Sequence, residues 1–158
     1  MKAIFAGTFD PFTIGHRDIV VRAAGLFDTV TVAVAEDTGK STAPLDVRTE
    51  IAKTAVNDLP NVTVVGFSGL LTDFAKKQGS ALLIRGVRNA ADLDYERDLT
   101  NVYKSMSGIE SLIIISSPEL AHVSSSVVRT IAALGGDISQ FVVKSTVQKI
   151  TEIYGKKE

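Results

Sequence analysis

The chain has 158 residues, 45% of them apolar, and its 17 basic and 18 acidic residues leave a net charge of −1 at pH 7. This size and composition predict a single folded domain over residues 1–158, and the missing basic excess argues against nucleic acid as a partner. The chain has no cysteine, which excludes disulfides, and only two histidines, which exclude a multi-histidine metal site. Its apolar runs are at most four residues long, which excludes a membrane-spanning helix. We therefore expect a cytoplasmic protein with no membrane partner.

Aliphatic and β-branched runs alternate along the chain with segments of helical periodicity. Several of these runs are apolar at consecutive positions, which is typical of strands in a parallel sheet that helices cover on both faces. The predicted strands are Lys2–Ala6, Thr29–Ala35, Val62–Phe67, Ala81–Ile84 and Ser111–Ser116.

The segments between the predicted strands place apolar residues at the spacing of an amphipathic helix. Ile19, Val20 and Ala23 share a stripe of the first helix, and a closing helix is predicted over Lys144–Tyr154. The fourth helix carries the stripe Tyr95, Leu99, Val102, Tyr103 and Met106.

Capping residues mark the ends of two further helices. Ser68 is the predicted N-cap of the third helix, which ends at Gly79. Ser124 is the predicted N-cap of the fifth helix, which Gly135 and Gly136 end. Five such β-α units with right-handed connections predict an α/β protein: a single Rossmann-like, doubly wound domain with a five-stranded parallel sheet and helices on both faces.

Ligands of such sheets bind beyond the carboxyl ends of the strands, where the strand order switches. The loops after the predicted strands are therefore expected to hold the site residues. These loops are Gly7–Gly15, Glu36–Pro44, Arg85–Ala91 and Ser117–Val123.

The first of these loops has the composition of a phosphate-binding turn. Gly7 and Thr8 follow the first strand, and Gly15-His16 opens the first helix, whose free N–H groups and dipole attract anions. A histidine there can donate a hydrogen bond to a phosphate oxygen, while the dipole disfavours its own protonation. The alternative is an ordinary solvent-facing His16, but the neighbouring glycines and threonine favour the phosphate site.

Two arginines lie at the end of the fourth strand, where Arg85 and Arg88 flank Gly86. Guanidinium groups at this position suit phosphate recognition, because each can bind two oxygens. The alternative is a structural role, in which both arginines form ion pairs with the nearby carboxylates at positions 92, 94 and 96.

Three consecutive serines, Ser124 to Ser126, begin the fifth helix. Hydroxyls beside free helix N–H groups can cradle a triphosphate, although a serine that serves only as an N-cap needs no ligand. Arg129 lies one turn later and either reaches the same phosphates or forms a surface ion pair. His122, just before the serines, has the pattern of an ordinary loop histidine.

A lysine in the second loop mimics the end of a Walker A motif in the run Gly39-Lys40-Ser41. That motif requires a glycine where Val34 stands, so the P-loop interpretation fails. A lone loop lysine is usually solvated, and the local sequence assigns Lys40 no further role.

Two spaced motifs at the N-terminus carry a family resemblance. Gly-Thr-Phe-Asp-Pro at 7–11, followed by Thr-x-Gly-His at 13–16, resembles the signature of the (H/T)xGH nucleotidyltransferase superfamily. With four further segments in the same order, the whole chain resembles the bacterial phosphopantetheine adenylyltransferase family. Those segments are Phe67–Leu71, Ile84–Arg88, Asp92–Glu96 and Val123–Arg129.

The resemblance implies a reaction in coenzyme A biosynthesis. The adenylyl group of ATP passes reversibly to 4′-phosphopantetheine, giving dephospho-coenzyme A and pyrophosphate. Mg²⁺ is the implied cofactor, carried by the triphosphate with no metal ligand from the protein, and a homohexamer is the implied assembly.

The same resemblance implies the roles of single residues. His16 stabilises the pentavalent phosphorus of the transition state and Thr8 orients the incoming phosphate. Lys40, Arg85 and Arg88 balance charge. The implied phosphopantetheine contacts are Thr8, Lys40, Leu71 and Arg85. The implied ATP contacts are Thr8, Phe9, His16, Gly86, Val87, Arg88, Glu96, Leu120, Ala121, His122, Val123, Ser124, Ser125 and Ser126.

Three alternatives remain open from the sequence. A cytidylyltransferase of the same superfamily would show an Arg-Thr-x-Gly-Ile-Ser-Thr-type segment where this chain has Val-Ser-Ser-Ser at 123–126. A nicotinamide-mononucleotide adenylyltransferase differs in its acceptor. A catalytically silent nucleotide-binding module would release no pyrophosphate, and the joint presence of His16, Arg88 and the three serines argues against it.

Overall fold

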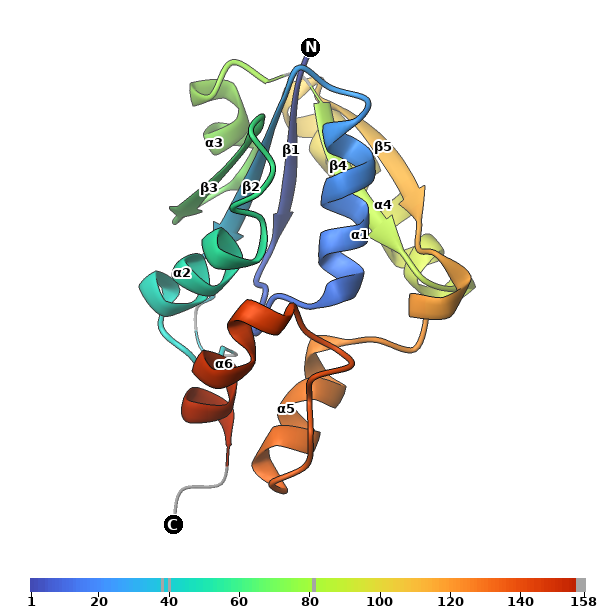
Figure 1. Cartoon of the computed structure of the whole chain (residues 1–158). Helices are drawn as coiled ribbons and strands as arrows, with labels where there is room; N and C mark the ends of the chain where they lie inside the picture. Colours follow the sequence, from blue (N-terminus) through green and yellow to red (C-terminus); the bar gives the residue numbers. More distant parts are fainter. Residues whose placement is uncertain (38, 40, 81, 156–158) are drawn as a thin grey trace.

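One parallel sheet organises the molecule, and Figure 1 shows its strands running side by side. The computed structural model describes residues 1–37, 39, 41–80 and 82–155. Strand order is β3-β2-β1-β4-β5, with every neighbouring pair parallel. The strands are β1 (Lys2–Gly7), β2 (Thr29–Ala35), β3 (Val62–Phe67), β4 (Leu82–Val87) and β5 (Glu110–Ile115). The predicted α/β fold is confirmed.

The pleat of the strands divides the core into two parts, because successive side chains point to opposite faces. In β1, Ala3 and Phe5 belong to one buried cluster, and Ile4 and Ala6 to the other. The helices that cover the faces and the carboxyl ends of the strands are α1 (Ile14–Ala24), α2 (Leu45–Ala55), α3 (Leu71–Lys77), α4 (Ala90–Ser107), α5 (Ser125–Ala133) and α6 (Val147–Tyr154). Short 3₁₀ turns, Pro118–Leu120 and Lys144–Thr146, precede α5 and α6.

Helices lie on both faces of the sheet, as the continuous apolar runs predict. The first core takes Val20 of α1 and Ala52 of α2. The second takes Ala75 of α3, with Tyr103 of α4 packed against it. Two helices, α5 and α6, lie instead beyond the carboxyl ends of the strands (Figure 1).

Strand β4 differs from its prediction in a way that matters for the site. It continues to Val87, so Arg85 lies inside the strand rather than in the following loop. Ala81, the predicted first residue, lies outside the described part of the chain. Strand β5 is shifted by one residue from Ser111–Ser116, a difference within the usual uncertainty of strand ends.

The two central strands part towards their carboxyl ends. Strand β1 pairs with β2 along its whole length, from Lys2–Thr29 to Gly7–Val34. Its register with β4 comprises Ile4–Leu83 and Phe5–Ile84 among the described residues. One residue further, the side chain of Arg85 donates from Nη1 to the Ala6 carbonyl oxygen at 3.1 Å. Beyond the Phe5–Ile84 pair, the Arg85 guanidinium therefore provides a side-chain link between β4 and β1.

One predicted cap is wrong and two predicted helix ends are confirmed. Helix α3 has Leu70 rather than Ser68 at its N-cap, with no side-chain cap bond, because Gly69 takes a positive φ of 83° and delays the start of the helix. Ser124 caps α5 by accepting the Val127 N–H at 3.2 Å. After α5, Gly135 turns the chain with φ of 77°.

Helix α4 leaves its apolar stripe in solvent. None of its 18 residues is buried, and Tyr95, Val102 and Met106 are 66%, 51% and 54% exposed. The spacing predicted an amphipathic helix correctly, but most of the stripe faces away from this chain's own core. The described helices include none long and apolar enough to cross a membrane.

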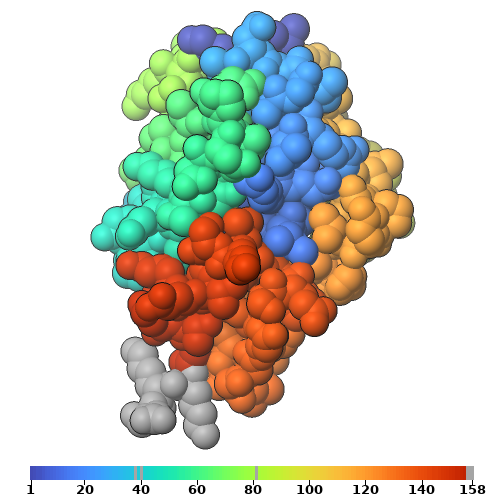
Figure 2. Space-filling view, in the orientation of Figure 1, coloured from blue at the N-terminus to red at the C-terminus, as the bar shows by residue number. Residues whose placement is uncertain are grey.

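The C-terminal segment closes one end of the molecule. Figure 2 shows α5 and α6, in orange and red, below the blue N-terminal loop and the teal α2. Helix α6 buries Ile150 and Tyr154 in this position. Residues from the end of the chain therefore lie next to the first loop.

Candidate active site

A cleft of about 400 Å³ lies where β1 and β4 part. This is the switch in strand order at which open parallel sheets bind ligands. Most of the predicted site residues line it: Thr8, Phe9, His16, Arg85, Gly86, Val87, Arg88, Glu96, Leu120, Val123, Ser124, Ser125 and Ser126. Leu71, Ala121 and His122 are not among its lining residues. Lys40 lies outside the described residues.

His16 is held by the capping box that starts α1. The Oγ1 atom of Thr13 accepts the His16 N–H at 3.4 Å, and Nδ1 of His16 accepts the Thr13 N–H at 3.0 Å. Because Nδ1 is an acceptor, the neutral imidazole carries its hydrogen on Nε2. Within the described part of the chain, Nε2 has no hydrogen-bond partner and remains available to a ligand in the cleft.

Aromatic rings surround this imidazole. The ring centroids of Phe9, Phe12 and Phe5 lie 4.9, 5.3 and 6.4 Å from that of His16. Burial among them, with a smaller effect of the Arg88 charge, lowers the pKa of His16 to about 4. The sequence predicted a neutral histidine from the helix dipole, but desolvation is the main cause.

Gly7 leaves space for the side chain of Phe9. A Cβ at Gly7 would meet two ring atoms of Phe9 at 3.0 Å. The absence of a side chain at Gly7 therefore makes room for the aromatic ring beside His16.

Arg85 forms a bidentate ion pair across the cleft floor. Its Nε and Nη2 atoms donate to Oε2 and Oε1 of Glu96 at 2.5 and 2.8 Å. Both side chains are mostly buried, at 13% and 12% exposure. The pair ties β4 to α4, and its bond to Ala6 ties it to β1.

Arg88 bridges two elements at the rim. It donates from its backbone N–H and Nε to Oδ2 of Asp92, at 3.1 and 2.9 Å, and from Nη1 to the Val123 carbonyl at 3.5 Å. The hydrogen bonds from Arg88 lower the pKa of Asp92. Arg85 and Arg88 thus form ion pairs with nearby carboxylates, as the structural role considered from the sequence predicted. Both arginines nevertheless line the cleft.

The three serines have separate partners. Ser124 caps α5. The Ser125 hydroxyl donates to the Pro11 carbonyl at 2.8 Å, and Ser126 accepts a 3.4 Å bond from Arg129. The helix start is therefore fixed to the first loop, and all three serines line the cleft.

Sequence reasoning missed three buried polar residues beside the site: Asp10, Arg48 and Tyr154, which are 4%, 2% and 5% exposed. A signal for Arg48 existed, because it precedes Ile51 and Ala55 by three and seven positions and so lies on their buried stripe. Residues Asp92, Tyr95 and Ser116, which were not assigned to ligands, also line the cleft.

Comparison with known proteins identifies the family. A family described as cytidylyltransferase-like matches residues 4–131. A phosphopantetheine adenylyltransferase from Methylobacillus flagellatus is 45% identical over 153 residues, covering 96% of each chain. One from Proteus mirabilis is 42% identical over 158 residues, covering 99% of this chain and 98% of its own. The chain belongs to the phosphopantetheine adenylyltransferase family.

This membership confirms that the chain is a nucleotidyltransferase, as the N-terminal motifs predicted. A solved structure from Vibrio parahaemolyticus, assigned as a nicotinate-nucleotide adenylyltransferase, superposes with a TM-score of 0.71 over 94% of this chain and 97% of its own. Its sequence identity is 15%, so the likeness to that solved structure concerns the Rossmann-like fold alone.

Proposed function

We propose that this cleft transfers the adenylyl group of ATP to 4′-phosphopantetheine, forming dephospho-coenzyme A and pyrophosphate in coenzyme A biosynthesis. The observation that carries adenylyl transfer is His16, a neutral imidazole fixed through Nδ1 with Nε2–H available at the strand switch point. The names of the full-length relatives support the acceptor.

The reaction needs alignment and charge stabilisation more than proton transfer. The terminal phosphate of phosphopantetheine is already anionic at neutral pH and can attack the α-phosphorus directly. The Nε2–H group of His16 stabilises the charge that develops on the pentavalent phosphorus, as a preorganised donor in a partly desolvated cleft. Thr8 orients the attacking phosphate, and Lys40 and Arg88 balance the remaining charge.

The two substrates divide the cleft. ATP occupies the side of the Arg88 rim, with its phosphates at the start of α5, where Ser124 to Ser126 fix the helix N–H groups. Gly86, Val87, Glu96 and residues 120–123 complete this side. Phosphopantetheine lies towards Arg85 and Thr8, with Leu71 contacting the arm beyond the cleft described above. Apart from Leu71, Ala121 and His122, the residues assigned to the two sides line one and the same cleft.

Mg²⁺ enters with the triphosphate as part of the substrate. The carboxylates that line the cleft, Asp92 and Glu96, accept bonds from Arg88 and Arg85. No group of three or more histidine, aspartate or glutamate side chains in the described ranges forms a metal cluster. Mg²⁺ usually keeps several waters and binds through substrate phosphates, which fits this donor set.

A homohexamer is the proposed assembly. Its support in this chain is the exposed apolar stripe on α4, which a neighbouring copy would cover. The cytoplasmic location expected from the sequence stays a prediction.

The deciding experiment is a pyrophosphate-release assay with ATP and three acceptors: phosphopantetheine, nicotinamide mononucleotide and glycerol phosphate. We expect turnover with phosphopantetheine alone. Turnover only with nicotinamide mononucleotide would show that the protein is a nicotinamide-mononucleotide adenylyltransferase instead. Absence of release with every acceptor would favour a silent nucleotide-binding module.

A further inference from the structure

Phe9, in the middle of the first loop, has a backbone conformation that residues other than glycine rarely adopt. Its φ of 47° lies in the left-handed region, where a side chain crowds the main chain. Such a conformation persists only where the surrounding structure fixes it. The contacts of the two flanking residues, Thr8 and Asp10, identify the groups that fix it here.

Arg48 of α2 anchors the residue before Phe9. Its side chain is 2% exposed, and Nη1 donates to the Thr8 carbonyl at 2.5 Å and to the Ala35 carbonyl at 2.8 Å. Its Nε atom donates to the Ala43 carbonyl at 2.9 Å. A buried guanidinium thus fixes the main chain of Thr8, a residue that lines the cleft.

The buried carboxylate of Asp10 anchors the residue after Phe9. Its Oδ2 atom accepts the Thr42 N–H at 2.8 Å, and its Oδ1 atom accepts the Ala43 N–H at 3.3 Å. The same Oδ1 atom accepts a hydrogen bond from the Tyr154 hydroxyl at 2.5 Å, across 144 positions of sequence. The carboxylate therefore connects the first loop to the segment before α2 and to the last helix.

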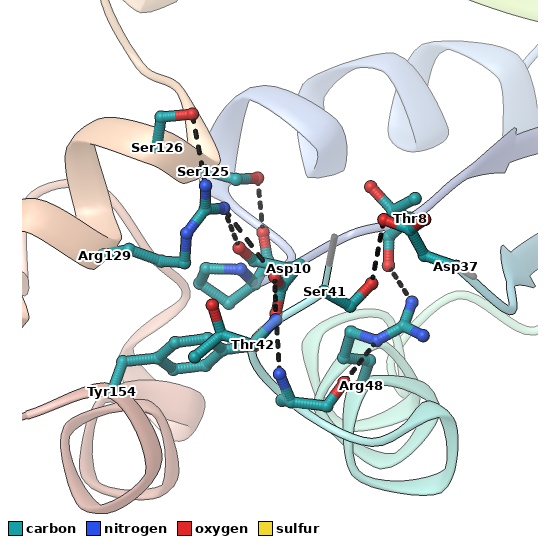
Figure 3. Close-up of polar contacts among 12 residues, drawn as sticks. Thr8, Asp10, Asp37, Ser41, Thr42, Arg48, Ser125, Ser126, Arg129 and Tyr154 are labelled. Carbon is teal, nitrogen blue, oxygen red and sulfur yellow. Dashed lines mark hydrogen bonds and ion pairs between the residues drawn. The ribbon is translucent and has the colours of Figure 1, made fainter. Parts of the chain in front are cut away.

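Tyr154 is the residue of α6 that reaches this loop. Burial, together with the bond to Asp10, raises the pKa of its phenol, so the hydroxyl stays protonated and donates. Figure 3 shows Tyr154 approaching Asp10 while Arg48 approaches Thr8. Phe9 therefore lies between two residues that α2 and α6 hold through buried side chains.

The conformation of Phe9 determines what surrounds His16. The Phe9 ring lies edge-on to the imidazole, with ring centroids 4.9 Å apart, and it fills the space beside Gly7. A change of the main chain at Phe9 would move this ring and would also turn Thr8 relative to the cleft.

We propose that Asp10, Arg48 and Tyr154 are positioning residues that hold the left-handed turn in the first loop. Through this turn, α2 and α6 set where Thr8 and the ring beside His16 lie at the cleft. The three are not among the described residues that line the cleft, so they act through the main chain of the loop. Their expected effect on turnover rests on the proposed function, whereas their effect on the surroundings of His16 does not.

The first test is an NMR titration of His16 in Tyr154→Phe, which removes one oxygen atom from the cluster. We expect the pKa of His16 to rise from about 4 in the wild type to about 5 in the variant, because a looser turn admits water to the imidazole. The chain has one other histidine, His122, whose signals are identified with His122→Gln. The matched control is Thr146→Val, which removes a buried hydroxyl at the start of α6, bonded to the Val143 carbonyl, and should leave the pKa of His16 unchanged.

The second test is turnover, compared in a double-mutant cycle with Thr8→Val. Tyr154→Phe should lower kcat for phosphopantetheine adenylylation about tenfold, since a small displacement of positioned groups slows such a reaction strongly. The KM for ATP should change by less than about twofold, because the transition state is affected more than the bound nucleotide. In the Thr8→Val background the loss of kcat should be less than about threefold, because one of the groups that the turn positions is already gone. Thr146→Val should leave kcat unaltered.

The possible outcomes separate this inference from the proposed function. An unchanged pKa of His16 in Tyr154→Phe, an equal rise in Thr146→Val, or equal losses of kcat in both backgrounds would overturn the positioning role. If the wild type has no phosphopantetheine turnover, or Thr8→Val has wild-type kinetics, that part of the proposed function fails and the NMR comparison alone decides the inference. Should Tyr154→Phe fail to fold, Arg48→Lys, which keeps the charge but lacks the guanidinium fork, enters both tests with the same expectations.

Discussion

His16 combines two tasks that usually belong to different residues. Its Nδ1 atom completes a helix cap with Thr13, in the place where a glutamate or glutamine normally reaches back. The cap fixes both the ring and its tautomer, which leaves Nε2–H available in the cleft. The capping role shown by the structure and the catalytic role proposed above therefore fall on one imidazole, and a substitution that separates the two roles tests the mechanism.

His16→Gln provides that separation, because glutamine is a normal residue at this position of a capping box but lacks the imidazole Nε2–H. We expect kcat to fall about 10²–10³-fold, as for loss of one preorganised donor. ATP affinity and the unfolding midpoint should stay close to wild type, whereas His16→Ala should lower both kcat and stability. Steady-state kinetics, calorimetry and thermal unfolding measure the three quantities. Near-wild-type turnover in His16→Gln would show that the residue is only a cap.

The charge of His16 gives a prediction about pH. Its pKa of about 4 lies below the ordinary value of 6.5, so the folded state binds fewer protons than the unfolded state between these values. The stability that neutral His16 contributes is complete above pH 6.5 and is lost as the pH falls towards 4. We expect the NMR signals of the His16 imidazole to titrate near pH 4, with Nε2 protonated at pH 7. A midpoint between 6 and 7 would contradict the desolvated environment.

Arg88→Ala should weaken ATP binding about tenfold or more, because it removes a charge-assisted phosphate contact. Its partner Asp92 is 28% exposed, so solvent can hydrate the carboxylate left behind. Arg97→Ala is the matched control, since Arg97 lies on α4, as Asp92 does, and pairs with Asp94 and Asp98 in solvent. Calorimetric titration with ATP compares the two variants. Equal losses of affinity in both would remove Arg88 from the ATP site.

At the scale of the elements, β4 and α4 together build one wall of the cleft. Strand β4 ends with Arg85, Gly86 and Val87. The first turns of α4 supply Glu96, which pairs with Arg85, and Asp92, which pairs with Arg88 just after the strand. The remainder of α4 extends away from the cleft with its apolar stripe exposed. One helix thus contributes to a site at one end and presents an unpartnered surface at the other.

Val102→Glu should disrupt assembly while leaving the fold intact. Val102 is 51% exposed in the single chain, so glutamate costs little there, but a carboxylate buried between copies would be unpaired. We expect the wild type to sediment as a hexamer and Val102→Glu as smaller species. Leu134→Glu, at an 80% exposed position outside α4, is the control. Identical sedimentation of wild type and Val102→Glu would exclude this stripe as the interface.

At the scale of the whole molecule, the sequence predicted the sheet because its signals are local. The runs that became β2 and β3 were apolar or β-branched at consecutive positions, and their bounds are those predicted. The helix cap at Ser124 was likewise readable within four residues. The carboxyl end of β4 could not be predicted in this way. The strand continues through Arg85 because it pairs with β5 up to Val87–Ile115, and that pairing is not visible in the local sequence.

The candidate site divides in the same way. His16, Arg88 and the three serines lie in the loops after β1, β4 and β5 or at the helix starts that follow them, so topology alone predicts that they meet. The bonds of Asp10 to Tyr154 and of Arg48 to three carbonyls join distant parts of the chain. No local pattern encodes such partners, because they are selected by the packing of α6 and α2 against the first loop.

The parting of β1 and β4 has a consequence for the stability of the folded protein. Beyond Phe5–Ile84 the described ladder gives way to the Arg85 side chain, so the sheet has a seam at its centre. Thr8 and His16 lie on one lip of this seam, and Arg85 and Arg88 on the other. In the proposed complex ATP contacts both sides of this seam, and because a ligand that binds only the folded state stabilises it, ATP raises the free energy of unfolding. We therefore expect the thermal unfolding midpoint to rise with the concentration of ATP.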